Sequence, residues 1–364
     1  MTNRRGHRAG RAPRATLATL AEELGVSRTT VSNAYNRPDQ LSPELRERIL
    51  STARARGYSG PNPTARSLRT SRAGSVGVIL TERLSYAFED QASLDFLAGL
   101  AVDNDFLLTL IPTGPGGEGG LGADAVSNAI VDGFVVYSVP AADPNLAFAR
   151  QRGLPVVVCD QPADLRGVSY VGIDDFAAIQ PAAAALVQAG HRNIGILTKR
   201  LFSGMRDGAV TAADVELSDM HVQRARVRGA LEVFRAAGLT HVPIVNRHFS
   251  DIDSAADGAR ELRGLHPDIT AILCTTDSMA LGVIEAFGPE VPHELSVTGF
   301  DAIVDATQRG LTTVEQLNHA KGEQVGALIN ALFRNEGAAR ATPQRVILPT
   351  RFIPGATVAP PAAR

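Results

Sequence analysis

Three side chains near residue 30 have the chemistry needed to read the edges of DNA bases. Arg28 can donate two parallel hydrogen bonds to guanine, and Asn33 can bridge the edge of adenine. The methyl group of Thr29 can contact the methyl group of thymine. These contacts form only if one helix carries all three residues into the major groove, so the elements around them decide the interpretation. On pattern alone, the alternative is a set of solvated polar positions on a small helical bundle.

Residues 16–57 are predicted to form three short helices that present these side chains. Thr16 can cap a first helix with an apolar face, and Gly25 ends it. Ser27 is placed to cap the second helix, which carries the three base-reading candidates. A third helix ends at Gly57. The tight link between the first two helices is typical of a helix-turn-helix.

The charge of the chain is divided unequally along its length. The 364 residues carry a net charge of −2. Residues 1–72 contain 14 arginines, no lysine and five acids, a net charge of +9, so the remainder carries −11. A basic block on an acidic body is expected when one end meets a polyanion, and guanidinium suits bidentate contacts with phosphate and guanine. Charge alone is equally compatible with a disordered basic tail.

Acidic residues follow apolar runs at three places in the second part of the chain. Asp160, Asp277 and Asp301 each come at or just after the end of a run that reads as a buried strand. Because open parallel sheets bind ligands beyond the carboxyl ends of their strands, these carboxylates are candidates for ligand contacts. Asp is also common in turns and at helix N-caps, and Asp277 is predicted to cap the helix that follows it.

The fold class predicted for this part is α/β. Strands are predicted at Val76–Leu80, Phe106–Ile111, Gly133–Tyr137, Val156–Cys159, Ile194–Leu197, Pro243–Val245, Ile272–Thr275 and Ser296–Phe300. Helices are predicted between them, including Phe176–Ala189, Gln223–Ala237, Ser254–Gly264 and Asp277–Phe287. This alternation favours parallel sheets covered on both faces, and about 280 residues suffice for two doubly wound lobes with a ligand cleft between them. The Gly- and Asp-containing stretch 202–217 is predicted to be an inserted mobile loop, with disorder favoured over a role as a lid.

Several classes of protein are disfavoured by composition and motifs. The 44% hydrophobic and 20% charged residues exclude a collagen-like or wholly disordered chain. No apolar run approaches the roughly 18 residues that span a membrane, and the Arg-rich start lacks the apolar region of a signal peptide, so a cytoplasmic location without membrane contact is expected. Cys159 and Cys274 lie in apolar runs and are read as buried hydrophobes. A transporter's solute receptor would share the cleft but should carry a signal peptide and no helix-turn-helix.

An enzyme is the other alternative, because residues 117–122 match the glycine pattern of dinucleotide-binding loops. The match lies in a Gly- and Pro-rich loop with poor spacing to a strand-end acid, so no cofactor is expected. The sequence offers no His/Cys set with metal-ligand spacing and no Ser/His/Asp arrangement. We therefore expect neither enzymatic activity nor a metal.

The segment "TLATLAEELGVSRTTVSNAY" and the residues that follow it to position 80 resemble the headpiece of the lactose-repressor (LacI/GalR) family of transcription regulators. The resemblance implies DNA contacts from the helix-turn-helix and from a hinge helix, at Thr16, Ser27, Arg28, Thr29, Thr30, Ser32, Asn33, Asn36, Asn62, Ala65, Arg66 and Leu68. Leu68 would be a minor-groove wedge, because partial unstacking bends DNA onto more protein surface. The alternative for Leu68 is an ordinary linker residue.

Two departures from the family pattern concern DNA recognition. Asn33 stands where the family usually has an arginine, so the preferred base at that position is expected to differ. One extra residue separates Tyr58 from Pro61, which is expected to alter the angle at which the hinge enters the groove.

The second part resembles the periplasmic-binding-protein-like effector domain of the same family, through "VDGFVV", "GHRNIGIL", "RVRGALEVF", "TTDSMALGVIEAF", "VPHELSVTGFDA" and "LTTVEQ". The resemblance implies that Arg226 grips polar groups of a small effector, while Asp160 and Asp301 accept its hydroxyl or amine hydrogens. Further effector contacts are expected from Thr276, Tyr86, Phe88 and Gln316. Thr276 replaces a usual asparagine, and Asp253 stands where some sugar-binding members place an aromatic ring, so a stacked hexose is not assumed.

Together these features predict a homodimeric, ligand-responsive DNA-binding repressor. Its partners would be a double-stranded, pseudo-palindromic operator, a sugar or related polar metabolite, and a second copy of the chain, with a tetramer left open. The predicted domains are a disordered basic tail at 1–14, a headpiece at 15–60, a hinge helix and linker at 61–73, and a ligand-binding and dimerisation domain at 74–355. Within the last, the N-lobe is expected at about 74–173 and 316–344, and the C-lobe at about 174–315 and 345–355.

Overall fold

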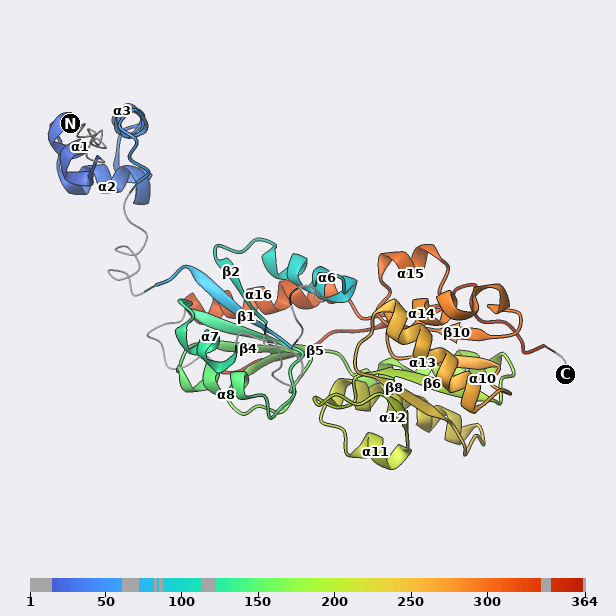
Figure 1. The fold of residues 1–364 in the computed structure, drawn as a ribbon. Helices are drawn as coiled ribbons and strands as arrows, with labels where there is room; N and C mark the ends of the chain where they lie inside the picture. Colours follow the sequence, from blue (N-terminus) through green and yellow to red (C-terminus); the bar gives the residue numbers. More distant parts are fainter. Residues whose placement is uncertain are drawn as a thin grey trace, which may run out of the picture. The chain divides into compact units, whose positions relative to one another are not determined.

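The computed structural model in Figure 1 describes most of the chain, namely residues 15–60, 72–81, 84, 88–112, 122–334 and 342–362. The chain divides into two compact units, at 1–73 and 74–364. The predicted basic tail at 1–14, and positions 61–71 of the predicted hinge, lie outside the described residues.

The first unit contains the three predicted helices, α1 (Leu17–Leu24), α2 (Arg28–Asn36) and α3 (Pro43–Ala55), with a 3-10 turn, η1, at Pro38–Gln40. Each α-helix begins at a hydroxyl cap. The hydroxyl oxygens of Thr16, Ser27 and Ser42 accept the backbone N–H groups of residues 19, 30 and 45 at 3.3, 3.0 and 3.3 Å. Gly25 ends α1 with a φ of 65°, a conformation that favours glycine. The helix-turn-helix prediction is confirmed.

The three helices are held together by a small apolar core. Leu20, Val31 and Ile49, one from each helix, are completely buried. Tyr35 and Tyr58 pack against this core, and their rings meet edge to face with centroids 6.1 Å apart. The core fixes the angle between α1 and α2, which leaves the start of α2 exposed.

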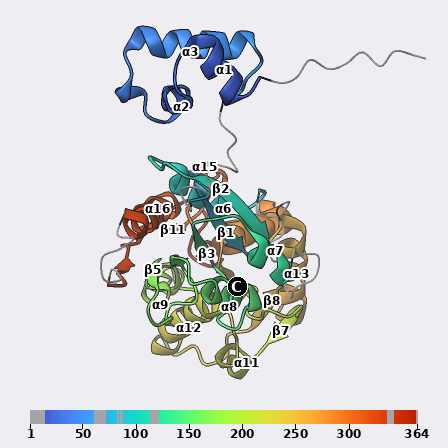
Figure 2. The same cartoon turned by 90° about the vertical axis from the view of Figure 1, so that its left-hand side faces the viewer.

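The N-lobe of the second unit is a six-stranded parallel sheet in the order β12-β5-β4-β3-β1-β2. Its strands are β1 (Ser75–Leu80), β2 (Leu107–Pro112), β3 (Gly133–Tyr137), β4 (Val156–Cys159), β5 (Ser169–Gly172) and β12 (Arg345–Ile347). One face is covered by α6 (Gln91–Ala101) and α16 (Asn318–Arg334), and the other by α7 (Gly122–Asn128) and α8 (Pro144–Gln151). The strands lie between these helix pairs (Figure 2), as the continuous apolar runs predict.

The C-lobe is a five-stranded sheet in the order β10-β9-β6-β8-β7. Its strands are β6 (Ile194–Lys199), β7 (Gly208–Val210), β8 (Ile244–Arg247), β9 (Ala271–Cys274) and β10 (Ser296–Thr298). On one face pack α9 (Asp175–Ala178), α10 (Gln180–Gln188) and α12 (His221–Ala236), and on the other α13 (Ile252–Leu265) and α14 (Asp277–Phe287). Three short helices complete it, α11 (Ala212–Glu216), η3 (Gly288–Glu290) and α15 (Val304–Gln308).

Three crossovers connect the lobes, after β5, before α16 and after β12. In the last two, β11 (Thr313–Glu315) and β13 (Arg351–Ile353) form an antiparallel pair. The lobe boundary predicted near residue 344 is wrong, because residues 345–347 pair in parallel with residues 170–172 of the N-lobe sheet. The chain therefore returns to the N-lobe for one short strand before its last crossover.

Two further predictions about segments need correction. The stretch 202–217 is ordered, because β7 pairs antiparallel with β8 and Thr211 and Asp214 form a reciprocal cap at the start of α11. Its acidic residues are used in local hydrogen bonds rather than left in a mobile loop. The single helix predicted at 176–189 is divided into α9 and α10, where Pro181 lies in the first turn of the second helix.

The tightest helix contact in the N-lobe provides a test of the fold. A methyl group added at Gly99 in α6 would overlap the carbonyl oxygen of His319, at the start of α16. We expect Gly99→Ala to lower the free energy of unfolding by about 1–3 kcal/mol, measured by urea denaturation. Gly264→Ala, in α13 where nothing lies within 4 Å, should leave stability unchanged or raise it slightly. Equal stability of the two variants would contradict this packing.

Candidate functional site

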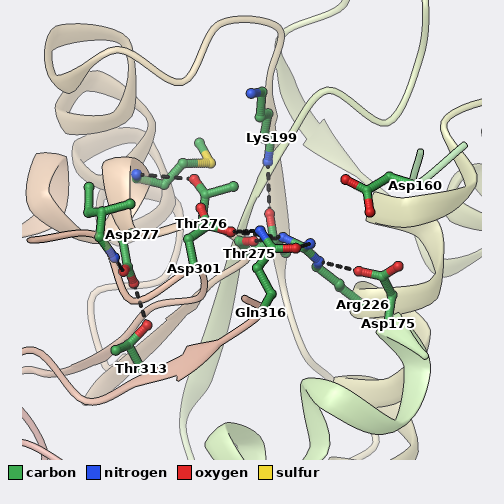
Figure 3. Close-up of polar contacts among 12 residues, drawn as sticks. Asp160, Asp175, Lys199, Arg226, Thr275, Thr276, Asp277, Asp301, Thr313 and Gln316 are labelled. Atoms are coloured by element: carbon green, nitrogen blue, oxygen red, sulfur yellow. Dashed lines mark hydrogen bonds and ion pairs between the residues drawn. The ribbon is translucent and has the colours of Figure 1, made fainter. Parts of the chain in front are cut away.

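Arg226 of α12 lies at the centre of a buried polar cluster (Figure 3). Its Nε donates to the Asp175 carboxylate at 2.8 Å, and its Nη1 donates to the carbonyl oxygen of Thr275 at 2.9 Å. The guanidinium carbon lies 3.8 Å from the centre of the Phe300 ring, a cation–π contact. Nη1 is also 3.6 Å from the Asp301 carboxylate. The side chain of Arg226 on α12 therefore contacts the segments that follow β5, β9 and β10.

Gln316, in the second crossover, connects this arginine to the N-lobe. Its Oε1 accepts hydrogen bonds from Arg226 Nη2 at 3.2 Å and from Lys321 Nζ at 2.6 Å, while its Nε2 donates to Asp301. Lys321, on α16, also donates to Asp160 Oδ1 at 2.8 Å and is completely buried. The cluster therefore contains two cations and three carboxyl groups, bridged by one amide.

The structure brings together four of the residues predicted to bind an effector, namely Asp160, Arg226, Asp301 and Gln316. Asp160 is paired with Lys321 and is linked to Arg226 only through the Gln316 oxygen. Two charged members of the cluster were missed. Asp175 follows β5, a strand that the sequence pattern did not reveal, whereas Lys321 carried a usable signal as one of only two lysines in the chain.

Thr276 and Asp277 both hold the start of α14 in place. Thr276 is the cap of α14, because its hydroxyl oxygen accepts the Met279 N–H at 3.3 Å, so the prediction that Asp277 caps this helix is wrong. The Asp277 carboxylate instead accepts the Ile303 N–H at 2.9 Å and the Thr313 hydroxyl at 2.5 Å. These bonds tie α14 to the chain around β11. Burial raises the pKa of Asp277 to about 6.

A cavity of about 70 Å³ lies between the lobes, in the cleft that the alternating pattern predicts. Its N-lobe wall is formed by Leu80, Thr81, Asp90, Ser93, Tyr137, Ser138 and Gln161, and its C-lobe wall by Lys199, Arg200, Met220, Val222 and Gln223. Lys199 Nζ lies 3.9 Å from the Asp90 carboxylate, an ion pair between the lobes. Of the two predicted aromatic contacts, Phe88 is 53% exposed and does not line the cavity, and Tyr86 lies outside the described residues.

On the first unit, Arg28 and Thr29 are exposed at the start of α2. The other predicted DNA contacts are engaged locally. Ser27 lies 2.8 Å from the Thr30 hydroxyl, and Asn33 donates to Gln40 at 3.0 Å. Thr16 caps α1, and Asn36 donates to the carbonyl and hydroxyl oxygens of Ser32 at 3.0 and 3.1 Å. The predicted hinge contacts lie outside the described residues, namely Asn62, Ala65, Arg66 and Leu68.

The described residues give little indication of a metal site, a reactive cysteine or a membrane span. Within the described ranges, no three His, Cys, Asp or Glu side chains are grouped so as to hold a metal ion. Both cysteines are buried and form no disulfide, and burial raises their pKa values well above the ordinary range, which fits the reading of them as hydrophobes. Across the same ranges, none of the helices combines the length and apolarity needed to cross a membrane.

Comparison with known proteins relates both units to one family. The model of the periplasmic binding protein-like domain matches residues 183–358. The HTH-type transcriptional regulator IpsA of Corynebacterium glutamicum is 50% identical, and the match covers 95% of this chain and 98% of IpsA. The crystal structure of a LacI family transcriptional regulator from the same species is 46% identical, with a TM-score of 0.72 over 94% of this chain and 98% of that one.

A more distant structure extends the likeness in fold. The lac repressor dimer bound to operator and the anti-inducer ONPF is 20% identical, with a TM-score of 0.74 over 95% of this chain and all of that one. At this identity the likeness shows the fold alone.

The carboxyl group of Asp301 makes stability dependent on pH. Burial, opposed by Arg226, raises its pKa to about 8, so the folded protein at pH 5–8 holds a proton that the unfolded chain has released. This contribution to stability is complete below pH 3.8 and is lost as the pH rises through 8. The free energy of unfolding should therefore fall by up to about 1.4 kcal/mol per pH unit in this window.

Asp301→Asn removes this titration, so its stability should fall less steeply between pH 5 and 8 in urea denaturation series. Asp268→Asn, which changes an exposed carboxylate of the same lobe, should follow the wild type. A wild-type slope in the Asp301 variant would contradict the assignment.

Proposed function

Because the chain belongs to the LacI family of transcriptional regulators, we propose that its first unit binds an operator and that a small molecule bound between the lobes of its second unit controls this binding. The observation that carries the proposal is the cavity lined by both lobes, together with the buried charged cluster that joins Arg226 of one lobe to Lys321 of the other. A ligand in that cavity contacts both lobes at once, so its affinity depends on their arrangement. A ligand with equal affinity for both arrangements would shift nothing.

The operator contacts are proposed for the start of α2. Arg28 and Thr29 are exposed there, and the cap at Ser27 fixes the direction in which they leave the helix. We propose that two chains form a homodimer whose paired α2 helices read a pseudo-palindromic operator, with the residues at 62–68 contacting its centre. The similarity in fold to a repressor dimer on its operator supports this arrangement. Repression follows if the bound dimer blocks transcription.

The effector is proposed to be a sugar or a related polar metabolite. The cavity wall combines the acid of Asp90, the amine of Lys199 and the amide of Gln223, which offer both donors and acceptors to hydroxyl groups. Tyr137 is the aromatic residue in this wall, and one face of its ring is stacked on Phe96 with centroids 4.1 Å apart. Arg226, Asp160, Asp301, Gln316 and Thr276 are proposed to respond to the effector by exchanging some of their present partners for its hydroxyl groups.

The base-reading role of Arg28 can be tested with operator variants. Footprinting first locates the operator, and fluorescence anisotropy then measures binding to each single-base variant. Arg28→Ala should cost about 1–3 kcal/mol at one base pair and relax specificity there. Arg54→Ala, on the exposed surface of α3, should leave base preference unchanged. Uniform weakening over all base pairs by Arg28→Ala would assign Arg28 to a phosphate instead.

A substitution that keeps the positive charge of Arg226 can separate its role in effector binding from its role in folding. A thermal-shift screen of sugars, nucleosides and polyols first identifies an effector. Arg226→Lys should then weaken effector binding about tenfold or more in calorimetry, because lysine cannot reproduce the planar fork of hydrogen bonds. Arg228→Lys, two residues along the same helix and half-exposed, is the matched control. Loss of operator binding by Arg226→Lys without effector would show that the residue is structural.

A further inference from the structure

Helix α12, which carries Arg226, begins without a cap from its own lobe. Its N-cap residue is Met220, whose side chain makes no capping hydrogen bond. Four other helices of the C-lobe have side-chain caps, Asp174 for α9, Thr211 for α11, Asp251 for α13 and Thr276 for α14. The first N–H groups of a helix have no partner within it, so those of α12 require acceptors from elsewhere.

The acceptor comes from the opposite lobe. Gln161, which follows β4 of the N-lobe sheet, accepts the Val222 N–H on its Oε1 at 3.1 Å. Its Nε2 donates to the carbonyl oxygen of Ser138 at 3.3 Å and lies 3.6 Å from the Met220 sulfur. Only 1% of Gln161 is exposed. A second contact also joins the start of α12 to the N-lobe, because His221 forms a hydrogen bond with the backbone of Asp160.

Gln161 cannot follow α12 if the lobes move apart, because the N-lobe holds the preceding residue at several points. The Asp160 N–H donates to Val171 of β5 at 2.9 Å, and the Tyr170 hydroxyl donates to the Asp160 carbonyl at the same distance. Lys321 holds its carboxylate. Asp160 has a φ of 65°, a strained conformation for a residue with a side chain, which these contacts maintain. Separation of the lobes would therefore remove the acceptor from Val222.

We propose that Gln161 caps α12 across the cleft and is a positioning residue for effector binding. Closure of the lobes completes the first turn of α12, and opening leaves that turn without its acceptor. Val222 lies four residues before Arg226, so the turn that Gln161 orders lies directly beneath the guanidinium on the same helix face. The capping contact stands on geometry alone, whereas its effect on effector binding rests on the proposed function.

Hydrogen exchange of the full-length protein, monitored by mass spectrometry, tests this cap without effector or operator. Gln161→Met keeps the length of the side chain but removes its acceptor, and should speed exchange about tenfold or more at residues 221–224 while β6 and β9 stay protected. Thr211→Ala, which removes a cap formed within the C-lobe, should affect α11 alone. Gln308→Met makes the same substitution at an exposed position and should change nothing.

A rescue separates capping from packing. Met220→Ser gives α12 a hydroxyl at its own N-cap position, so in the Gln161→Met background it should restore slow exchange at residues 221–224. Unchanged exchange there in Gln161→Met, equal acceleration throughout the C-lobe, or failure of this rescue would overturn the proposal. These measurements contain neither operator nor effector, so failure of the cap is distinguishable from failure of the Arg28 and Arg226 tests, which would leave the cap intact.

Discussion

The buried Gln316 amide is the junction on which the arrangement of the two lobes depends. Its oxygen accepts from Arg226 of the C-lobe and Lys321 of the N-lobe, while its nitrogen donates to Asp301. A charge taken out of water must be paired and hydrogen-bonded, because an isolated buried charge is prohibitively costly. Arg226 also has Asp175 and Thr275 as partners in its own lobe, and Lys321 has Asp160, but the Gln316 oxygen joins the two cations only when both lobes and the crossover between them are in place. The need to satisfy buried charge thus becomes a restraint on the relative position of the lobes.

The contacts between the lobes differ in how readily they can separate. The charged cluster lies at the crossovers, where the chain itself holds the lobes together. The cavity, the Lys199–Asp90 pair and the Gln161–α12 contact join surfaces that belong to different lobes. A long ion pair at 3.9 Å and single hydrogen bonds are easier to exchange for ligand contacts than the fully buried cluster. This difference suits a body whose cleft contacts exchange first, while the buried cluster gives up partners only to an effector that replaces them.

Much of the fold could be predicted because local rules and tertiary packing agree. Hydroxyl caps, Gly25 and apolar spacing located the three headpiece helices, and continuous apolar runs located the central strands. The return of residues 345–347 to the N-lobe could not be predicted, since a three-residue edge strand has almost no pattern of its own. Arg226 and Asp301 were found through family resemblance, but Asp175 depended on an unseen strand. Residues 202–217 looked disordered because their polar side chains satisfy one another, which composition does not reveal.

The strong preference for arginine over lysine leaves the chain with only two side-chain amines. Both lie in the second unit. Lys321 is completely buried, whereas Lys199 lies in the cavity wall with 17% of its side chain exposed. Reagents that acylate lysine are therefore directed to a single, partly exposed lysine, although the chain carries 34 arginines. Covalent labelling, fluorophore attachment or enzymatic acetylation at that amine would replace a cation in the cleft while leaving every arginine of the DNA-binding unit untouched.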